Sequence, residues 1–70
     1  MKEYTIKMSW NADMRVWTAV NDDIPIALES NSYDVLVERV KIASPELLEL
    51  NGVSPECTLH FVADCKVGVA

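Results

Sequence analysis

This sequence contains few residues of the kinds that cross-link or anchor a small protein. Its 70 residues include two cysteines, two glycines, three prolines and one histidine. No apolar run approaches the roughly 18 residues that a transmembrane helix requires, and no apolar signal segment follows Lys2. We therefore expect a cytoplasmic protein, neither secreted nor held at a membrane, whose cysteines stay reduced.

The two cysteines, Cys57 and Cys65, fall in what reads as the last strand. A straight strand would separate them by about 26 Å, whereas a disulfide needs α-carbons within about 7 Å. Only a hairpin turn near Ala63-Asp64 would bring them together, so we do not expect an intramolecular disulfide. His60 would point to the opposite face from both cysteines. We therefore predict no metal site within one chain, and a site shared across a dimer remains an alternative.

Basic residues are also scarce, since six Lys plus Arg against eleven Asp plus Glu give a formal charge of −5. Phosphate backbones repel such a chain, so direct nucleic-acid binding is not expected and a protein partner would be basic. Half of the residues are hydrophobic, which excludes disorder by composition. We expect a single domain over residues 1–70. A core of this size rarely supplies more than roughly 3–5 kcal/mol of net stability. Because a partner subunit can add to that stability, we expect a homodimer.

Two strands are predicted at the start of the chain. Polar and apolar residues alternate over residues 3–10, which is typical of a strand with one buried face. Asn11-Ala12-Asp13 then supplies turn residues. A second strand, from about Met14 to Val20, has apolar residues on both faces, which indicates a central position or a second covered surface. Its alternation places Arg15 and Trp17 on one face.

A third strand and a helix follow. Asn21-Asp22-Asp23 ends the second strand, and we expect the turn through Ile24-Pro25 to set the register of a short third strand ending near Glu29. Pro25 lacks a backbone donor, which favours the sheet edge. Ser32 is the expected N-cap of a helix. Its apolar stripe comprises Tyr33, Leu36, Val37, Val40 and Ala43.

The end of this helix is predicted to be broken at Ser44-Pro45, because proline disfavours the helical conformation of the residue before it. Ser44 would then cap a second short helix, Pro45 to Leu50, which ends at Gly52. Residues 57–63 alternate again and predict a fourth strand. The tail, Lys66 to Ala70, could extend that strand or return beside it.

These elements predict an α+β fold of two layers, in which a helix covers one face of a three-stranded antiparallel meander. The fourth strand follows a helical crossover, so we expect it to lie parallel to the first. Three segments resemble known families. Residues 16–25 resemble the second-strand signature of HicB-type antitoxins, and Ser32-Tyr33 with the following stripe resembles their capped helix. Residues 45–52 resemble a small bacterial family of uncharacterised domains close to HicB.

The resemblance covers about residues 3–63 and implies a partial ribonuclease-H-like sheet of strand order 3-2-1-4. It also implies a toxin-binding domain, whose partners in the HicB family are small basic RNA-cleaving proteins. HicB antitoxins usually carry a DNA-binding part after this domain, and the chain ends at Ala70. Operator binding is therefore not carried over, and no toxin-contact residues are matched.

Catalytic interpretations find little support in these residues. Nucleases of the ribonuclease-H type need converging carboxylates on the central strand, and Tyr4 to Trp10 contains neither Asp nor Glu. Covalent catalysis needs a nucleophile beside a base, whereas Cys57 and His60 are expected on opposite faces. We therefore predict that the protein is not an enzyme and needs no metal or cofactor.

The remaining candidates are aromatic. Trp10 and Trp17 could anchor an interface together with Arg15, or they could fill the small core with the Arg15 stem packed across a ring. A protein-interaction module is the first hypothesis. A ligand-sensing or structural domain with a pocket between sheet and helix is the second, and a degenerate nucleic-acid-binding fold is the third.

Overall fold

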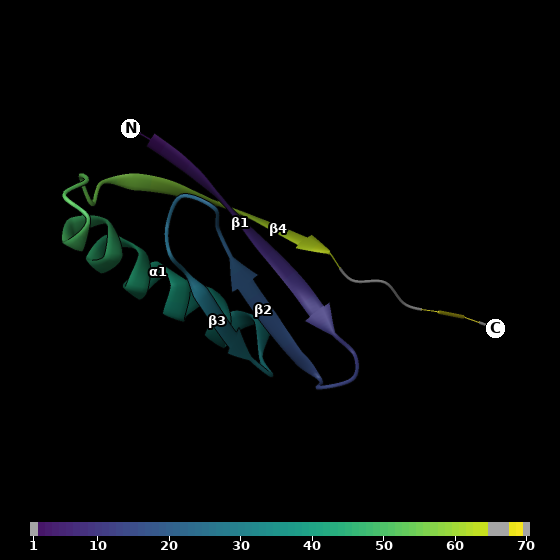
Figure 1. The fold of residues 1–70 in the computed structure, drawn as a ribbon. Coiled ribbons are helices and arrows are strands. Elements are labelled where there is room, and N and C mark those ends of the chain that lie inside the picture. The colour runs from purple at the N-terminus through teal and green to yellow at the C-terminus, as the bar shows by residue number, and fades with distance from the viewer. Residues whose placement is uncertain (1, 65–67, 70) are drawn as a thin grey trace.

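A four-stranded sheet with one helix across one of its faces forms the part of the chain that the computed structural model describes, residues 2–64 and 68–69 (Figure 1). The sheet has the order β3-β2-β1-β4, with β1 antiparallel to β2, β2 antiparallel to β3, and β4 parallel to β1. The predicted fold class and strand order are confirmed. The elements are β1 (Lys2–Asn11), β2 (Val16–Val20), β3 (Ala27–Ser30), α1 (Tyr33–Leu50) and β4 (Cys57–Asp64).

The core lies between the sheet and α1. Alternate residues of β1 point into it, as the period of two predicted, and successive turns of α1 face them. Each fully buried aliphatic side chain contributes roughly 1.5–3 kcal/mol relative to exposure. The buried hydrophobic residues are Tyr4, Ile6, Met8, Ala19, Ile24, Ile26, Leu36, Val40 and Leu48.

β2 lies inside the sheet, which is one of the two alternatives that its apolar residues predicted. It pairs with β1 on one side and with β3 on the other. Its second face is not covered by the described residues, since Val20 stays 42% exposed. The strand begins at Val16, later than predicted, because the Asn11 side chain accepts hydrogen bonds from the N–H groups of Asp13 (3.1 Å) and Met14 (3.2 Å). Arg15 therefore lies in the turn, exposed and with φ 55°, and is not a strand residue beside Trp17.

The turn before β3 is held by one asparagine. Asn21 Oδ1 accepts hydrogen bonds from the N–H groups of Asp23 and Ile24, both at 2.7 Å. Its Nδ2 donates to the Thr5 carbonyl at 2.7 Å, which ties the turn to β1. The turn extends through Pro25, so β3 begins at Ala27 and not at the proline. The strand is short and lies at the sheet edge, as predicted.

The helix starts and stops where the sequence predicts. Ser32 Oγ accepts the N–H of Val35 at 3.3 Å. At the other end, Asn51 is the C-cap and Gly52 has φ 72°, a conformation that glycine adopts without a Cβ clash.

The predicted break at Ser44-Pro45 is wrong, because α1 runs unbroken through Pro45. Ser44 is fully buried, and its hydroxyl donates to the Val40 carbonyl at 2.7 Å. An interior proline costs about 3 kcal/mol. Burial of Leu48, in the turn beyond the proline, keeps the last turns of the helix on the core and offsets that cost.

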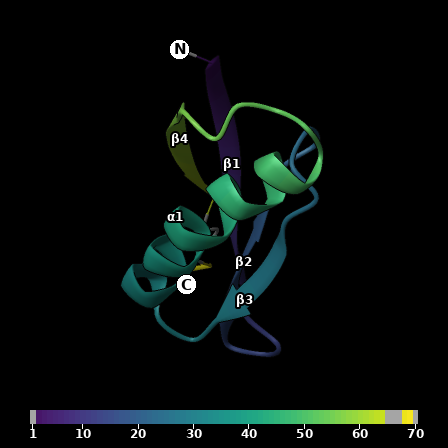
Figure 2. The ribbon, with the colours of Figure 1, turned by 90° about the vertical axis from the view of Figure 1, so that its left-hand side faces the viewer.

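The helix packs mainly on β2 and β3, so the β4 edge of the sheet is less covered (Figure 2). Leu59 and Phe61 of β4 are consequently half-buried, whereas their β1 neighbours Tyr4 and Ile6 are buried. Within residues 2–64 and 68–69, no helix combines the length and apolar character needed to cross a membrane. The predicted strand extension or return in the tail falls mostly outside the described residues.

Candidate functional site

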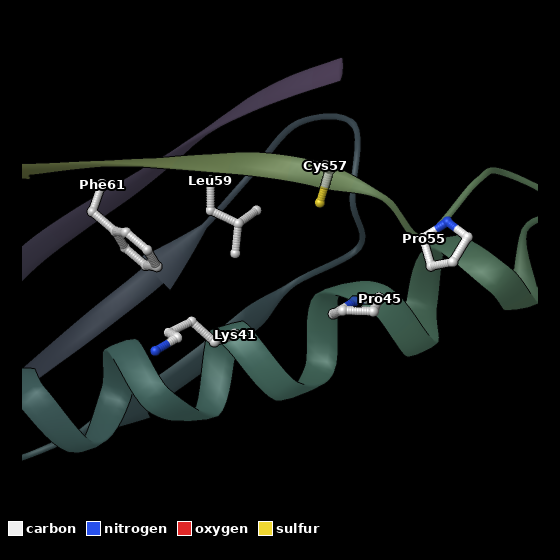
Figure 3. A pocket seen from close by; sticks show the side chains of 6 residues that line it. All are labelled: Lys41, Pro45, Pro55, Cys57, Leu59 and Phe61. Atoms are coloured by element: carbon white, nitrogen blue, oxygen red, sulfur yellow. The ribbon is translucent and has the colours of Figure 1, made fainter. Parts of the chain in front are cut away.

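A groove of about 410 Å³ separates α1 from β4 (Figure 3). Side chains of β4 form one side, the helix forms the opposite side, and the loop before β4 closes one end. The lining is mostly apolar. It comprises Lys41, Pro45, Pro55, Cys57, Leu59 and Phe61.

The β4 side of the groove follows from strand alternation. Cys57, Leu59 and Phe61 project toward the helix (Figure 3), in register with alternate residues of β1. All three are half-buried, because α1 covers the other half of the sheet. This row of apolar side chains is therefore available to a further apolar group.

The helix side carries acidic residues at its rim. Lys41 and Pro45 share a stripe of α1 with Asp34, Glu38 and Glu49, since these positions follow one another at spacings of three or four. Lys41 Nζ lies 3.1 Å from Glu38 Oε1, so its charge is already paired. We call Asp34, Glu38 and Glu49 the acidic rim. It places negative charge beside an apolar groove.

The predicted interface tryptophans lie at the other end of β1. Trp10 stands opposite Trp17 in the sheet register, with ring centroids 5.5 Å apart. Trp17 also makes an edge-to-face contact with Tyr33, at 5.0 Å. The three rings are half-buried, and Trp17 and Tyr33 pack against the core. Arg15 lies in the adjacent turn, and the interface role of these residues stays a prediction.

The residues considered for chemistry lie apart. Cys57 faces the groove, whereas His60 lies on the opposite face, with its Nδ1 3.8 Å from Glu3 Oε1. No group of three His, Cys, Asp or Glu side chains among the described residues could hold a metal ion. Cys65 lies outside that part of the chain. Cys57 and His60 therefore do not form a nucleophile–base pair.

The profile of a family described as "Domain of unknown function (DUF1902)" matches residues 3–69. The chain belongs to this family. The DUF1902 chain is also similar to the crystal structure of hypothetical protein TTHA1013 from the extremely thermophilic bacterium Thermus thermophilus, with a TM-score of 0.74 and 27% identity over 99% of each chain. No curated protein matches it.

Membership of DUF1902 confirms the resemblance to a family of uncharacterised domains. The kinship of this domain with HicB-type antitoxins stays a prediction. The sequence predicted a strand over residues 57–63 and offered a pocket between sheet and helix as an alternative, but it did not identify the residues that line this groove. What was missing was the lateral position of α1, which depends on packing and not on local pattern.

Proposed function

We propose that this DUF1902 domain is a protein-interaction module that binds its partner in the groove between α1 and β4. The observation that carries the proposal is the half-buried apolar row of Cys57, Leu59 and Phe61, left accessible beside the helix. Aliphatic and aromatic side chains in such a groove are typical anchors for a partner.

The charges around the groove favour a basic partner. The acidic rim carries three carboxylates, one of which is paired with Lys41. The whole chain has a formal charge of −5, so a basic protein would be attracted at long range and oriented at the rim. The resemblance to HicB-type antitoxins supports the same class of partner, a small basic toxin-like protein. The proposal includes no catalytic step.

Co-expression with a small basic protein encoded beside this domain tests the proposal. We expect the two proteins to co-purify, and we expect a Leu59→Lys variant of the groove to lose the partner. A Val62→Lys variant is the matched control, since Val62 lies on the same strand but on the face away from the helix. Equal capture of the partner by both variants would show that the groove is not the binding site. Capture that does not weaken as the salt concentration is raised would contradict an electrostatic contribution to binding.

A ligand-sensing domain is the second candidate, because the groove has a volume within the range of small-molecule sites, about 300–1,000 Å³. Its lining is apolar apart from one ammonium group, that of Lys41. That ammonium group is paired with Glu38, so the lining suits an uncharged apolar ligand. A thermal shift with such ligands, abolished by Leu59→Lys and without any protein partner, would favour this function.

A further inference from the structure

The two edges of the sheet differ in how well they are protected from pairing. β3 has four residues, follows Pro25, and has its Glu29 carbonyl bonded by Arg39 Nη1 at 3.2 Å. β4 has eight residues, contains neither proline nor lysine, and pairs with β1 in an unbroken register. Short length, a nearby proline and a covering side chain, as at β3, usually protect natural sheet edges from pairing with another strand. Among the described residues, no strand covers the outer edge of β4.

We infer that two copies of this chain pair along β4 in antiparallel fashion, so that two four-stranded sheets form one continuous sheet. This inference rests on the proposed role as an interaction module and names a second copy as the partner at the strand edge. Residues Cys57 to Ala63 carry no Asp, Glu, Lys or Arg, in a chain with a formal charge of −5. Two acidic copies can therefore pair along the β4 edge without bringing like charges together. A basic partner would gain no charge attraction at this edge and is better placed at the acidic rim.

Side-chain alternation restricts the register, because residues directly opposite in an antiparallel pair lie on the same face. A two-fold axis at Phe61 sets Phe61 against its copy, His60 against Val62, and Asp64 against Thr58. The aromatic pair adds about 0.5–1.5 kcal/mol in other proteins.

An axis at His60 is the competing register. It sets Asp64 against Glu56, so that two acids face each other at both ends of the interface. Like charges directly opposite are destabilising, so the axis lies at Phe61. Both helices are then on the same face of the joined sheet, and the two grooves lie side by side with the Phe61 pair between them.

Charge reversal across the axis tests this arrangement. His60 and Val62 are exposed on the face away from α1, so substitution there leaves the core intact. We expect wild-type protein to have about twice its monomer mass of 7.8 kDa by light scattering. H60E/V62E should weaken the dimer about tenfold or more, because carboxylates then face carboxylates. H60E/V62K should restore it to within about threefold of wild type, because each carboxylate then faces an ammonium group of the other copy.

A monomeric wild type at millimolar concentration, or equal dimerisation by the two double variants, overturns the inference. A second measurement addresses register directly, in a Cys57→Ser, Cys65→Ser background. We expect Phe61→Cys to form an intermolecular disulfide with oxidised glutathione, since opposed α-carbons lie about 4.5–5.5 Å apart. His60→Cys is the control and should not cross-link, because its copy would be about 7–8 Å away. The reverse result contradicts the axis at Phe61.

The same variants separate this inference from the proposed function. A monomeric H60E/V62E domain that still captures a basic protein leaves the groove function intact. If wild type is monomeric and yet captures that protein, the pairing of two copies is overturned alone. A dimer that captures nothing overturns the groove function alone.

Discussion

Asn21 is the residue on which the start of β3 depends. Its side chain makes three hydrogen bonds, two within the turn and one to the Thr5 carbonyl of β1. The sequence pattern placed a turn here, but it did not single out Asn21 within it. Asn21 has an amide donor that an aspartate lacks, and only this donor reaches β1. The difference could not be inferred without knowing that β1 passes beside the turn.

Replacement of Asn21 by alanine is expected to lower the free energy of unfolding by about 1–3 kcal/mol, because it removes three hydrogen bonds from one turn. Urea denaturation followed by tryptophan fluorescence measures the change. Asn11→Ala is the matched control, since among the described residues the Asn11 side chain bonds only within its own turn, and its expected cost is smaller. Equal costs at the two positions would contradict the assigned role of the Thr5 contact.

Glu49 is the residue that tests the acidic rim. Glu49→Lys should weaken binding of a basic partner roughly threefold to tenfold, as expected for one exposed charge that changes sign. Glu46→Lys is the control, because Glu46 is also exposed on α1 but lies off the stripe that borders the groove. Titration calorimetry at low salt measures both. If Glu46→Lys has the larger effect, the partner approaches another face of the helix.

At the scale of elements, the strands β1 and β4 and both ends of α1 follow from local pattern. Alternation, the Ser32 cap and the stop at Gly52 are determined within a few residues. The proline at position 45 is different, because its local preference opposes the helix and burial of Leu48 decides the outcome. The groove likewise depends on which strands α1 covers. Helical periodicity identifies the buried stripe of a helix but not its lateral position on a sheet.

Pro45→Ala is expected to stabilise the domain by about 1–3 kcal/mol, because alanine restores an N–H that can donate to the Lys41 carbonyl one turn earlier. Pro55→Ala is the matched control. It also lines the groove, but it lies in a loop, where loss of proline costs about 0.4–1 kcal/mol through the unfolded chain. Chemical denaturation shows whether each substitution raises or lowers the free energy of unfolding. Destabilisation by Pro45→Ala would mean that contacts of the ring outweigh the missing hydrogen bond.

At the scale of the whole molecule, one helix covers only part of a four-stranded sheet in the described residues. The groove beside α1 leaves apolar side chains for a partner, and it arises from the lateral displacement of the helix toward β3. The edge of β4 is left for a second copy because β4 is the last strand in the sheet order. A domain with its helix centred on β1 would lack the groove but would keep this edge.

Pairing of two copies makes thermal stability depend on protein concentration, because mass action favours the folded dimer. A tenfold rise in concentration adds about 1.4 kcal/mol per dimer, or half of that per chain, and 1 kcal/mol shifts the melting temperature of so small a domain by about 4–8 °C. We therefore expect Tm to rise by about 3–6 °C for each tenfold increase above the dissociation constant. Scanning calorimetry at several concentrations measures this rise. H60E/V62E should show this rise only at concentrations at least about tenfold higher, since its dimer is weaker by that factor. A wild-type Tm that does not change with protein concentration would mean that the β4 edge stays unpaired in solution.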